Sequence, residues 1–359
     1  ITDAVSVFGL TDSTEINTNN EINDVFKEHD QILIDPQGEK KEFRFIDAIQ
    51  NALSIALNKY DNLIFMGQDI SDYGGVFKIT DGFADEFGDS RVRNTPISEA
   101  APLGAALGLT IAGKKTMVEM QFADFVSCGF NQIVNNLAKT HYRWGQNCDV
   151  VIRMPTGGGL AAGPFHSQST EAWFFHVPGL KIVYPSTPSD AKGLLLASFE
   201  DPNPVLFFEH KGLYRSIKEN VHTQEYTIEI GKAKTLLEGE DVTFISYGIG
   251  VQWCQEVIDD LNIDATLIDL RTLVPWDKEC VEKGVESTGK VIVVHEDTEQ
   301  GGIGGEIAAW IGENCFTHLD APVMRVCSLD TPIPFNQNLE RNFMAKHRLK
   351  DKVIQLMNW

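Results

Sequence analysis

Short runs of apolar and β-branched residues recur along this chain, and segments with helical spacing separate them. The clearest run is Asp149 to Met154, and helical spacing is clearest from Phe45 to Leu57. Further helices are predicted at 133–142 and 189–199. The other predicted strands are residues 62–70, 116–120, 181–185, 204–209, 242–247, 266–270, 291–295 and 323–327. Strands that are apolar on both faces are typical of parallel sheets covered by helices. The sequence therefore predicts an α/β fold with two doubly wound sheets.

A length of 359 residues is enough for two domains. Residues 1–42 are polar and acidic, and they predict a linker or arm with little core of its own. Residues 43–218 form the first predicted α/β domain. A polar, turn-prone linker is expected at 219–234, and residues 235–359 form the second domain.

The composition excludes several classes of protein. A net charge of −21 without a basic cluster argues against nucleic-acid binding, because phosphate contacts need lysine and arginine. The six cysteines are far apart and form no CxxC pair, so reduced thiols are expected rather than disulfides or a zinc site. No apolar run approaches the roughly 18 residues of a membrane span, and no signal peptide is expected.

The stretch from Asn94 to Gln132 combines an acid, an amide and aromatic rings around a small-residue helix. Glu99 stands at the start of this alanine- and glycine-rich segment, whose small side chains allow another backbone to approach closely. Gln121, Phe122 and Phe125 follow the next predicted strand. This group would suit a flat heteroaromatic ligand. The alternative is that Glu99 caps the helix N-terminus and the phenylalanines belong to the core.

His166 lies in a loop rich in glycine, alanine and proline, just before Ser167, Gln168 and Ser169. A histidine in such a loop can transfer protons near neutral pH, and the alternative is an ordinary surface histidine. Surface positions are also expected for the other notable histidines, which are His176, His210 and His295.

Two glycine-rich segments invite a dinucleotide-binding interpretation. Residues 157–162 match GxGxxA after a strand, but a proline-containing loop follows instead of a helix. Residues 301–306 open a predicted helix but carry Ile307 in place of the third glycine. A nucleotide site is expected at neither segment, and the chain contains no P-loop sequence.

From about residue 43 onward the chain carries a series of longer motifs in a specific order. They are GQDISDYGGVFKIT, RVRNTPISEA, EMQFADF, NQIVNNLAK, HSQSTEAWF, PGLKIVYPSTPSDAKGLL, DPNPVLFFEHKGLYR, LIDLRTLVPWD and APVMRVCSLDTPIP. Together these motifs resemble the beta subunit of the thiamine-diphosphate-dependent decarboxylase of 2-oxo acid dehydrogenase complexes. EMQFADF, LRTLVPWD and RVCSLDTPIP resemble the branched-chain (2-oxoisovalerate) enzyme more than the pyruvate enzyme.

The resemblance implies a transketolase-like pyrimidine-binding domain, a transketolase C-terminal domain and a set of site residues. Glu99 matches the glutamate that meets the aminopyrimidine ring of thiamine diphosphate, where it assists activation of the cofactor. Phe125, Gln121 and Ile97 match other residues that line this ring. His166 matches the histidine that is placed near the incoming lipoyl group.

Metal binding is implied by the resemblance in two ways. Some relatives hold potassium largely through backbone oxygens, and the matching residues here are Val150, Ser198, Asp201 and Asn203. Val151 departs from the pattern, because a hydroxyl side chain can occur there. Magnesium is expected in the alpha partner, since the GDG…N motif that holds it is absent from this chain.

The resemblance also implies partners and a cellular location. The expected partners are an alpha subunit or a fused alpha segment, a second beta chain, and the dihydrolipoyl acyltransferase core with its lipoyl domain. The acidic start, which lacks methionine, would fit the segment that joins fused alpha and beta chains. The expected location is the cytoplasm for a bacterial protein and the mitochondrial matrix for a eukaryotic one.

Three alternatives remain open at this point. The chain could be a pyruvate-specific homologue, because much of the substrate pocket would come from the alpha partner. It could be half of a transketolase or of a 1-deoxyxylulose-5-phosphate synthase, although HSQS and the C-terminal motifs disfavour this. A scaffold without catalytic activity is disfavoured by Glu99.

Overall fold

Seven strands form the larger of two main sheets, in the order β12-β6-β7-β5-β4-β2-β3. The structure is a computed structural model that describes residues 25–359. All neighbouring pairs among β2 to β7 are parallel, and β12 is antiparallel to β6. The strands are β2 (Leu63–Gly67), β3 (Val92–Asn94), β4 (Lys115–Glu119), β5 (Val150–Thr156), β6 (Lys181–Val183), β7 (Val205–His210) and β12 (Thr272–Val274).

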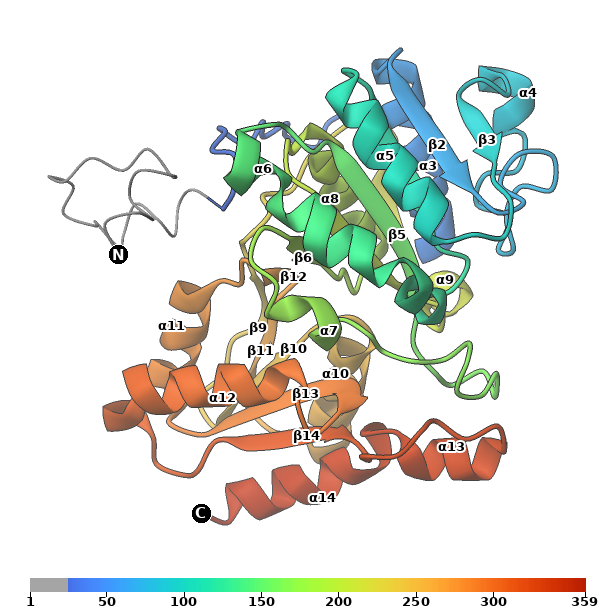
Figure 1. Cartoon of the computed structure of the whole chain (residues 1–359). Coiled ribbons are helices and arrows are strands. Elements are labelled where there is room, and N and C mark those ends of the chain that lie inside the picture. The colour runs from blue at the N-terminus through green and yellow to red at the C-terminus, as the bar shows by residue number, and fades with distance from the viewer. Residues whose placement is uncertain (1–24) are drawn as a thin grey trace, which may run out of the picture.

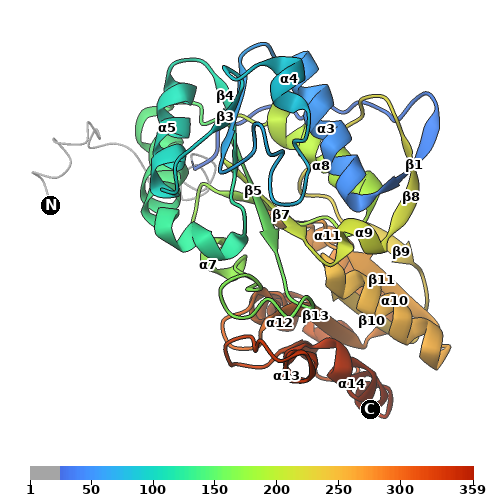
Figure 2. The same cartoon turned by 90° about the vertical axis from the view of Figure 1, so that its right-hand side faces the viewer.

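Helices cover both faces of this sheet, as expected for strands that are buried on both sides (Figures 1 and 2). The long helices α3 (Phe45–Lys59) and α8 (Pro188–Glu200) pack on one face. The other face carries α5 (Ala100–Ile111), the π-helical turn η2 (Gln132–Leu137) and α6 (Ala138–Trp144). Shorter helices are α4 (Phe83–Phe87), η1 (Ala123–Gly129), α7 (Ala172–Phe175) and α9 (Leu213–Ser216).

The second sheet has the strand order β14-β13-β10-β11-β9, with β9 antiparallel to β11 at the edge and the other pairs parallel. Its strands are β9 (Lys234–Leu237), β10 (Val242–Ser246), β11 (Ala265–Asp269), β13 (Val291–Thr298) and β14 (Met324–Ser328). Its helices are α10 (Ile249–Leu261), α11 (Lys278–Thr288), α12 (Ile303–Asn314), η3 (Phe316–His318), α13 (Gln337–Phe343) and α14 (Lys346–Met357). The predicted α/β class with two doubly wound units is confirmed.

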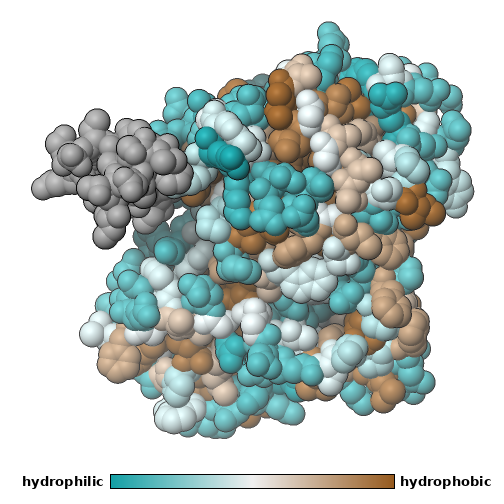
Figure 3. Space-filling view, in the orientation of Figure 1, coloured by the Kyte–Doolittle hydropathy of each residue, from teal (hydrophilic) through white to brown (hydrophobic). Residues whose placement is uncertain are grey.

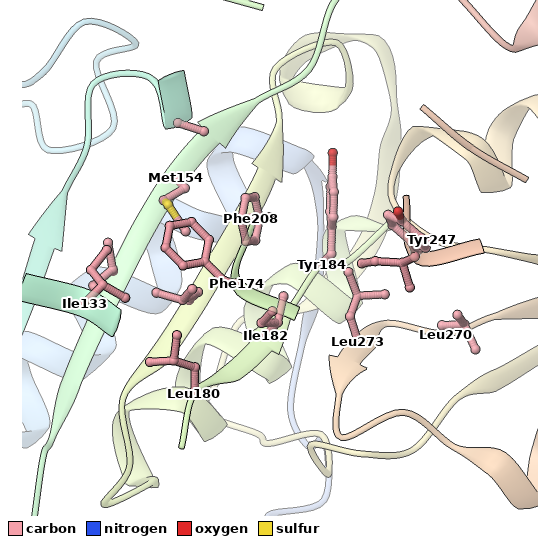
Figure 4. Close-up of a cluster of buried hydrophobic side chains, with 14 of the residues drawn as sticks. Ile133, Met154, Phe174, Leu180, Ile182, Tyr184, Phe208, Tyr247, Leu270 and Leu273 are labelled. Atoms are coloured by element: carbon pink, nitrogen blue, oxygen red, sulfur yellow. The ribbon is translucent and has the colours of Figure 1, made fainter. Parts of the chain in front are cut away.

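One hydrophobic core runs through both units. Figure 4 shows side chains from the larger sheet beside side chains from the second unit, with Tyr184 next to Tyr247. Their ring centroids are 5.3 Å apart. The second unit also supplies β12 to the edge of the larger sheet, so backbone hydrogen bonds join the two units as well.

Two short strands join segments that are far apart in sequence. β1 (Lys40–Arg44) pairs antiparallel with β8 (Lys218–His222), so ordered structure begins within the stretch that was expected to be an arm. Residues 25–39 contact the connection between the two units through Gln31–Ile230 and Ile34–Thr227 hydrogen bonds. The rest of the expected arm, residues 1–24, lies outside the described part of the chain.

The predicted helix at 133–142 differs in detail, because a π-helical turn and α6 divide the segment between them. Within residues 25–359, no helix combines the length and the hydrophobicity that crossing a membrane would require.

Candidate active site

The candidate site lies at the carboxyl edge of the larger sheet. In parallel sheets the residues that follow the strands meet at this edge, where ligands usually bind. Gln68 follows β2, Glu99 precedes α5, Gln121 follows β4, His166 lies beyond β5, and Lys211 follows β7. The topology therefore gathers polar side chains from five separate segments.

The Glu99 carboxylate accepts a hydrogen bond from the amide of Gln68, whose backbone is in turn contacted by Gln121. Gln68 Nε2 donates to Glu99 Oε1 at 3.1 Å, and Gln121 Nε2 donates to the Gln68 backbone oxygen at 3.4 Å. Glu99 occupies the N-cap position of α5, but its side chain makes no capping hydrogen bond to the helix. Glu99 is half-buried, and the nearby Ile97 side chain is 86% exposed.

Aromatic rings surround His166. The His166 ring meets Phe122 and Phe125 edge-on, with centroid distances of 4.8 Å and 5.4 Å. Asp124 is buried beside them, and its Oδ1 accepts from the Ser167 and Gln168 backbone N–H groups at 3.2 Å and 3.0 Å. The residues after His166 are thereby tied to η1, which contains Phe125 and follows directly after Phe122.

A glycine of η1 allows that helix to lie close to the start of α5. Gly129, the last residue of η1, lies against the first turn of α5, where an added Cβ would be 3.3 Å from the Glu99 backbone oxygen. The same Cβ would clash with Leu103 at 2.3 Å. Within α5 itself, an added Cβ at Gly108 would meet nothing within 4 Å, and one at Gly104 would make only ordinary contact with the Gln132 side chain at 3.5 Å. The predicted close approach of another backbone is therefore not seen at either glycine of α5, and it is Gly129 that places the backbone of Glu99 next to the helix that bears Phe125.

A buried cluster of charged side chains lies at the strand ends next to this site. Arg153 is fully buried on β5, and its guanidinium donates to Glu119 at 2.5 Å and to both oxygens of Glu209 at 2.6 and 2.7 Å. The Tyr214 hydroxyl also donates to Glu209. Burial raises the pKa of Glu119, and the charge of Arg153 opposes that shift. The charges are paired, so the strand ends beneath Gln121 are held in one arrangement.

His210 and Lys211 at the end of β7 are both buried, so the expected surface position of His210 is wrong. His210 Nε2 pairs with Glu296 Oε2 at 2.8 Å. Lys211 Nζ lies 5.4 Å from the centre of the Phe122 ring and has no hydrogen-bond partner within residues 25–359. Burial lowers the pKa of Lys211 to about 8, against the opposing charges of Asp124, Glu296 and Glu340.

His295 is also fully buried, and so its expected surface position is wrong as well. Its Nε2 lies 3.3 Å from Cys327 Sγ, and burial lowers the pKa of His295 to about 4. A Cβ at Gly302 or Gly304 would lie 2.6 or 2.7 Å from this ring. Packing against His295 therefore explains the glycines that resemble a nucleotide motif.

All six cysteines are free.

Of the residues expected at the potassium site, Asp201 and Asn203 contact each other. Asp201 and Asn203 are buried, and Asn203 Nδ2 donates to Asp201 Oδ1 at 2.8 Å. Lys181 Nζ lies 2.5 Å from Asp201 Oδ2, and Ser198 Oγ donates to the Leu194 backbone oxygen at 2.7 Å. A lysine thus already neutralises the one carboxylate of this group.

The assembled groups define what this edge can do chemically. A carboxylate beside two amides can bind the ring nitrogen and amino group of a heteroaromatic ligand. A phenylalanine can pack on the face of such a ring, and a half-buried histidine can exchange a proton. Gln68 and Asp124 were not singled out from the sequence. Gln68 fell inside the predicted strand 62–70, whereas β2 ends at Gly67 and leaves Gln68 just beyond its carboxyl end.

Comparisons with known proteins identify the domains and the family of this chain. Residues 41–217 match the transketolase pyrimidine-binding domain, and residues 231–348 match the transketolase C-terminal domain. The mitochondrial 2-oxoisovalerate dehydrogenase subunit beta 2 of Arabidopsis thaliana is 44% identical over 326 residues, which is 89% of this chain and 90% of that protein. The pyruvate dehydrogenase E1 component subunit beta of Staphylococcus epidermidis is 40% identical over 301 residues, which is 82% of this chain and 93% of that protein.

A solved structure described as a split gene transketolase, an inactive beta4 tetramer, shares the fold with a TM-score of 0.72. It is 22% identical and covers 88% of this chain and 98% of its own. The domain matches and the identities over most of both chains lead to one conclusion. The chain belongs to the family of thiamine-diphosphate-dependent 2-oxo acid dehydrogenase beta subunits, which are components of oxidoreductases.

Proposed function

We propose that this chain is the beta component of a branched-chain 2-oxo acid dehydrogenase. With an alpha partner, it would carry out the oxidative decarboxylation of a branched-chain 2-oxo acid and pass the acyl group to lipoamide. The observation that carries the proposal is the meeting of Glu99, Gln68 and Gln121 with the Phe122–Phe125–His166 group at one sheet edge. The higher identity to a 2-oxoisovalerate subunit than to a pyruvate subunit favours the branched-chain substrate.

Thiamine diphosphate, when bound, supplies the carbon that attacks the 2-oxo group and accepts the electron pair released by decarboxylation. The residues present fit its aminopyrimidine ring. Glu99 would hold or share a proton with a ring nitrogen, and Gln121 would orient the same ring. Phe125 would pack on its face, and Ile97 would line its edge. Gln68 would fix the Glu99 carboxylate through the hydrogen bond described above.

His166 would act in the transfer step alone. As the lipoyl dithiolane opens, one sulfur leaves as a thiolate and needs a proton. A histidine is partly protonated near pH 7 and can supply that proton. The Phe122 and Phe125 rings hold the imidazole, so its protonated nitrogen can be presented in a fixed direction.

The alpha partner would complete the site and hold magnesium with the diphosphate. Its docking is supported by the exposed face of α5, where apolar side chains gather in Figure 3. Ala101, Ala105 and Gly108 are exposed along this helix, and Ile111 at its end is 58% exposed. A second beta chain and the lipoyl domain of a dihydrolipoyl acyltransferase core are the other proposed partners.

The proposed domains divide the work between them. Residues 43–218 would supply every group of this chain that faces the cofactor. Residues 235–359 would hold the loop that carries His166 in place. The linker at 219–234 would connect the two. We propose the cytoplasm as the location in a bacterium and the mitochondrial matrix in a eukaryote.

Potassium is a further proposal, with Val150, Ser198, Asp201 and Asn203 as the residues around the ion. Because Lys181 already pairs with Asp201, the ion would be held mainly by backbone oxygens. Thermal melts in potassium chloride and in choline chloride at equal ionic strength test it. An equal melting temperature in both salts would contradict the proposal.

The test of the whole proposal uses the chain assembled with its alpha partner and a panel of 2-oxo acids. Branched-chain substrates should give the highest kcat/KM with an artificial electron acceptor. His166→Ala should then reduce acyl transfer to a lipoyl domain by about 100-fold, while the artificial acceptor reaction falls much less. A preference for pyruvate would overturn the substrate, and equal loss in both assays would overturn the role of His166.

A further inference from the structure

The loop that carries His166 depends on partners outside itself. Between β5 and α7 the chain contains no helix or strand, and four of its residues have positive φ angles. Three of these are glycines, but the fourth is Ala161 with φ 53°, a region that is costly for a residue with a Cβ atom. Backbone N–H groups in such a loop must find acceptors elsewhere.

The acceptors come from the C-terminal unit. Glu340 on α13 accepts from the Gly159 N–H at 2.9 Å and from the Ala161 N–H at 2.8 Å, one with each carboxylate oxygen. Glu296 on β13 accepts from the Gly158 N–H at 2.6 Å. Two carboxylates on different elements thus bind three N–H groups within four residues of the loop.

Both carboxylates are buried, Glu340 to 2% and Glu296 to 5% exposure. Glu296 is paired with His210, but Glu340 forms no ion pair within residues 25–359. Both acids act on Lys211. Burial lowers the pKa of this lysine, and the negative charges of Glu296 and Glu340 oppose that shift. Hydrogen bonds to a charged carboxylate are stronger than those between neutral groups, so these three bonds hold the backbone of the loop firmly in place.

Shape complements these bonds along the same loop. A Cβ at Gly158 would lie 2.6 Å from Ile333, and a Cβ at Gly163 would lie 2.2 Å from the Phe335 ring. Ile333 and Phe335 lie on the segment just before α13, so the backbone of the loop rests directly on the C-terminal unit. Figure 2 shows this loop lying over the region of α13.

His166 is therefore held from two sides. Before it, Glu340 fixes the backbone at Gly159 and Ala161. After it, Asp124 of the first unit fixes Ser167 and Gln168. We infer that Glu340 is a positioning residue for acyl transfer, through which the C-terminal unit sets the place of His166. This inference rests on the proposed function, because it assigns the importance of the loop to His166.

The test is Glu340→Gln in the assembled alpha–beta enzyme. The amide keeps one acceptor oxygen but loses the charge and one N–H partner. Hydrogen exchange of a peptide covering residues 157–169 should accelerate by about tenfold. Acyl transfer to a lipoyl domain should fall by about tenfold or more, while the artificial acceptor reaction stays within about twofold. Glu313→Gln, the same change at an exposed position of this unit, should alter none of the three.

The outcomes separate the claims. Unchanged exchange in Glu340→Gln would overturn the inference, as would equal losses in the two assays, which would indicate a general structural role. Faster exchange with normal transfer would also overturn it. If His166→Ala shows no selective loss, the proposed role of His166 fails, and the inference that Glu340 positions this residue is overturned with it.

A second variant can be used if the Glu340→Gln chain does not assemble with its alpha partner. Gly159→Ala strains the backbone of the same loop, because Gly159 has φ 88°. The added Cβ itself fits, since it would make only an ordinary contact with Met344 at 3.8 Å. It leaves Glu340 and the C-terminal unit unchanged. The same pattern of faster exchange and selective loss of transfer is expected, and a wild-type pattern would overturn the inference.

Discussion

Glu99 shows how one hydrogen bond separates two interpretations of the same residue. An acid at the first turn of a helix is most simply a cap, yet its carboxylate accepts from Gln68 and makes no side-chain cap to α5. Gln68 itself is tied to Gln121. The acid is therefore oriented by the amide of Gln68, which comes from another strand end, and a ligand-binding carboxylate needs such a fixed orientation.

Replacing Glu99 with glutamine in the assembled enzyme should leave the fold intact, because the side chains have the same shape. Loss of this acid should slow proton exchange at the reactive carbon of bound thiamine diphosphate by roughly 100-fold. Deuterium exchange followed by NMR measures that rate. Glu86→Gln, on the exposed surface of the same unit, is the control. A wild-type rate in Glu99→Gln would remove Glu99 from the chemistry.

Some of the site residues could be predicted from the sequence and others could not, for physical reasons. Glu99, Gln121, Phe125 and His166 stand beside recognisable motifs, and their clustering follows from parallel strands ending at one edge. The burial of His210 could not be predicted, because its partner Glu296 is 86 residues away. Only the packed fold brings such pairs together.

At the scale of elements, long apolar runs were predicted well and short edge strands were not. All nine predicted strands are present, because each run is apolar enough to show its burial directly. β12 was missed, since three residues carry no periodic signal and their pairing with β6 depends on a strand about 90 residues earlier. β1 and β8 were missed for the same reason, because each pairs with a distant segment and stays largely exposed.

The loop between β5 and α7 was recognised by its glycines, but its support was not. Its glycines were compared with a nucleotide-binding motif, and the missing helix argued against one. Their actual use is different, since Gly157 makes room for His210, whose ring would be 2.0 Å from an added Cβ. Glycines here allow a loop to lie on another unit, and that contact has no local sequence signal.

At the scale of the whole molecule, buried acids gather where the two units meet. Tyr247 of the second unit donates to Glu171 of the first at 2.9 Å. Burial raises the pKa of Glu171 well above its usual value, and Asp297 adds to that shift. Burial likewise raises the pKa of Asp297 to about 7, with Glu296 and Asp330 adding to the effect. The contact between the units should therefore respond to pH.

The sign follows from the raised pKa of Asp297. The folded chain binds the Asp297 proton more tightly than the unfolded chain, so the stabilising contribution is full below about pH 4 and is lost as pH rises through about 7. Asp297→Asn should remove that loss and raise stability at pH 8 relative to wild type by at least about 1 kcal/mol. Thermal melts from pH 5 to 8 measure it, with the exposed Asp351→Asn as control. Parallel pH profiles for Asp297→Asn and wild type would contradict this assignment.

The central claim is that this chain supplies one half of a thiamine diphosphate site. Isothermal titration calorimetry of thiamine diphosphate with magnesium, performed on this chain alone and on its complex with the alpha partner, tests it most directly. The account predicts weak or undetectable binding by the chain alone and tight binding by the complex, because the proposed roles of Glu99, Gln121 and Phe125 concern only the pyrimidine end of the cofactor. Micromolar binding by the chain alone would contradict the claim.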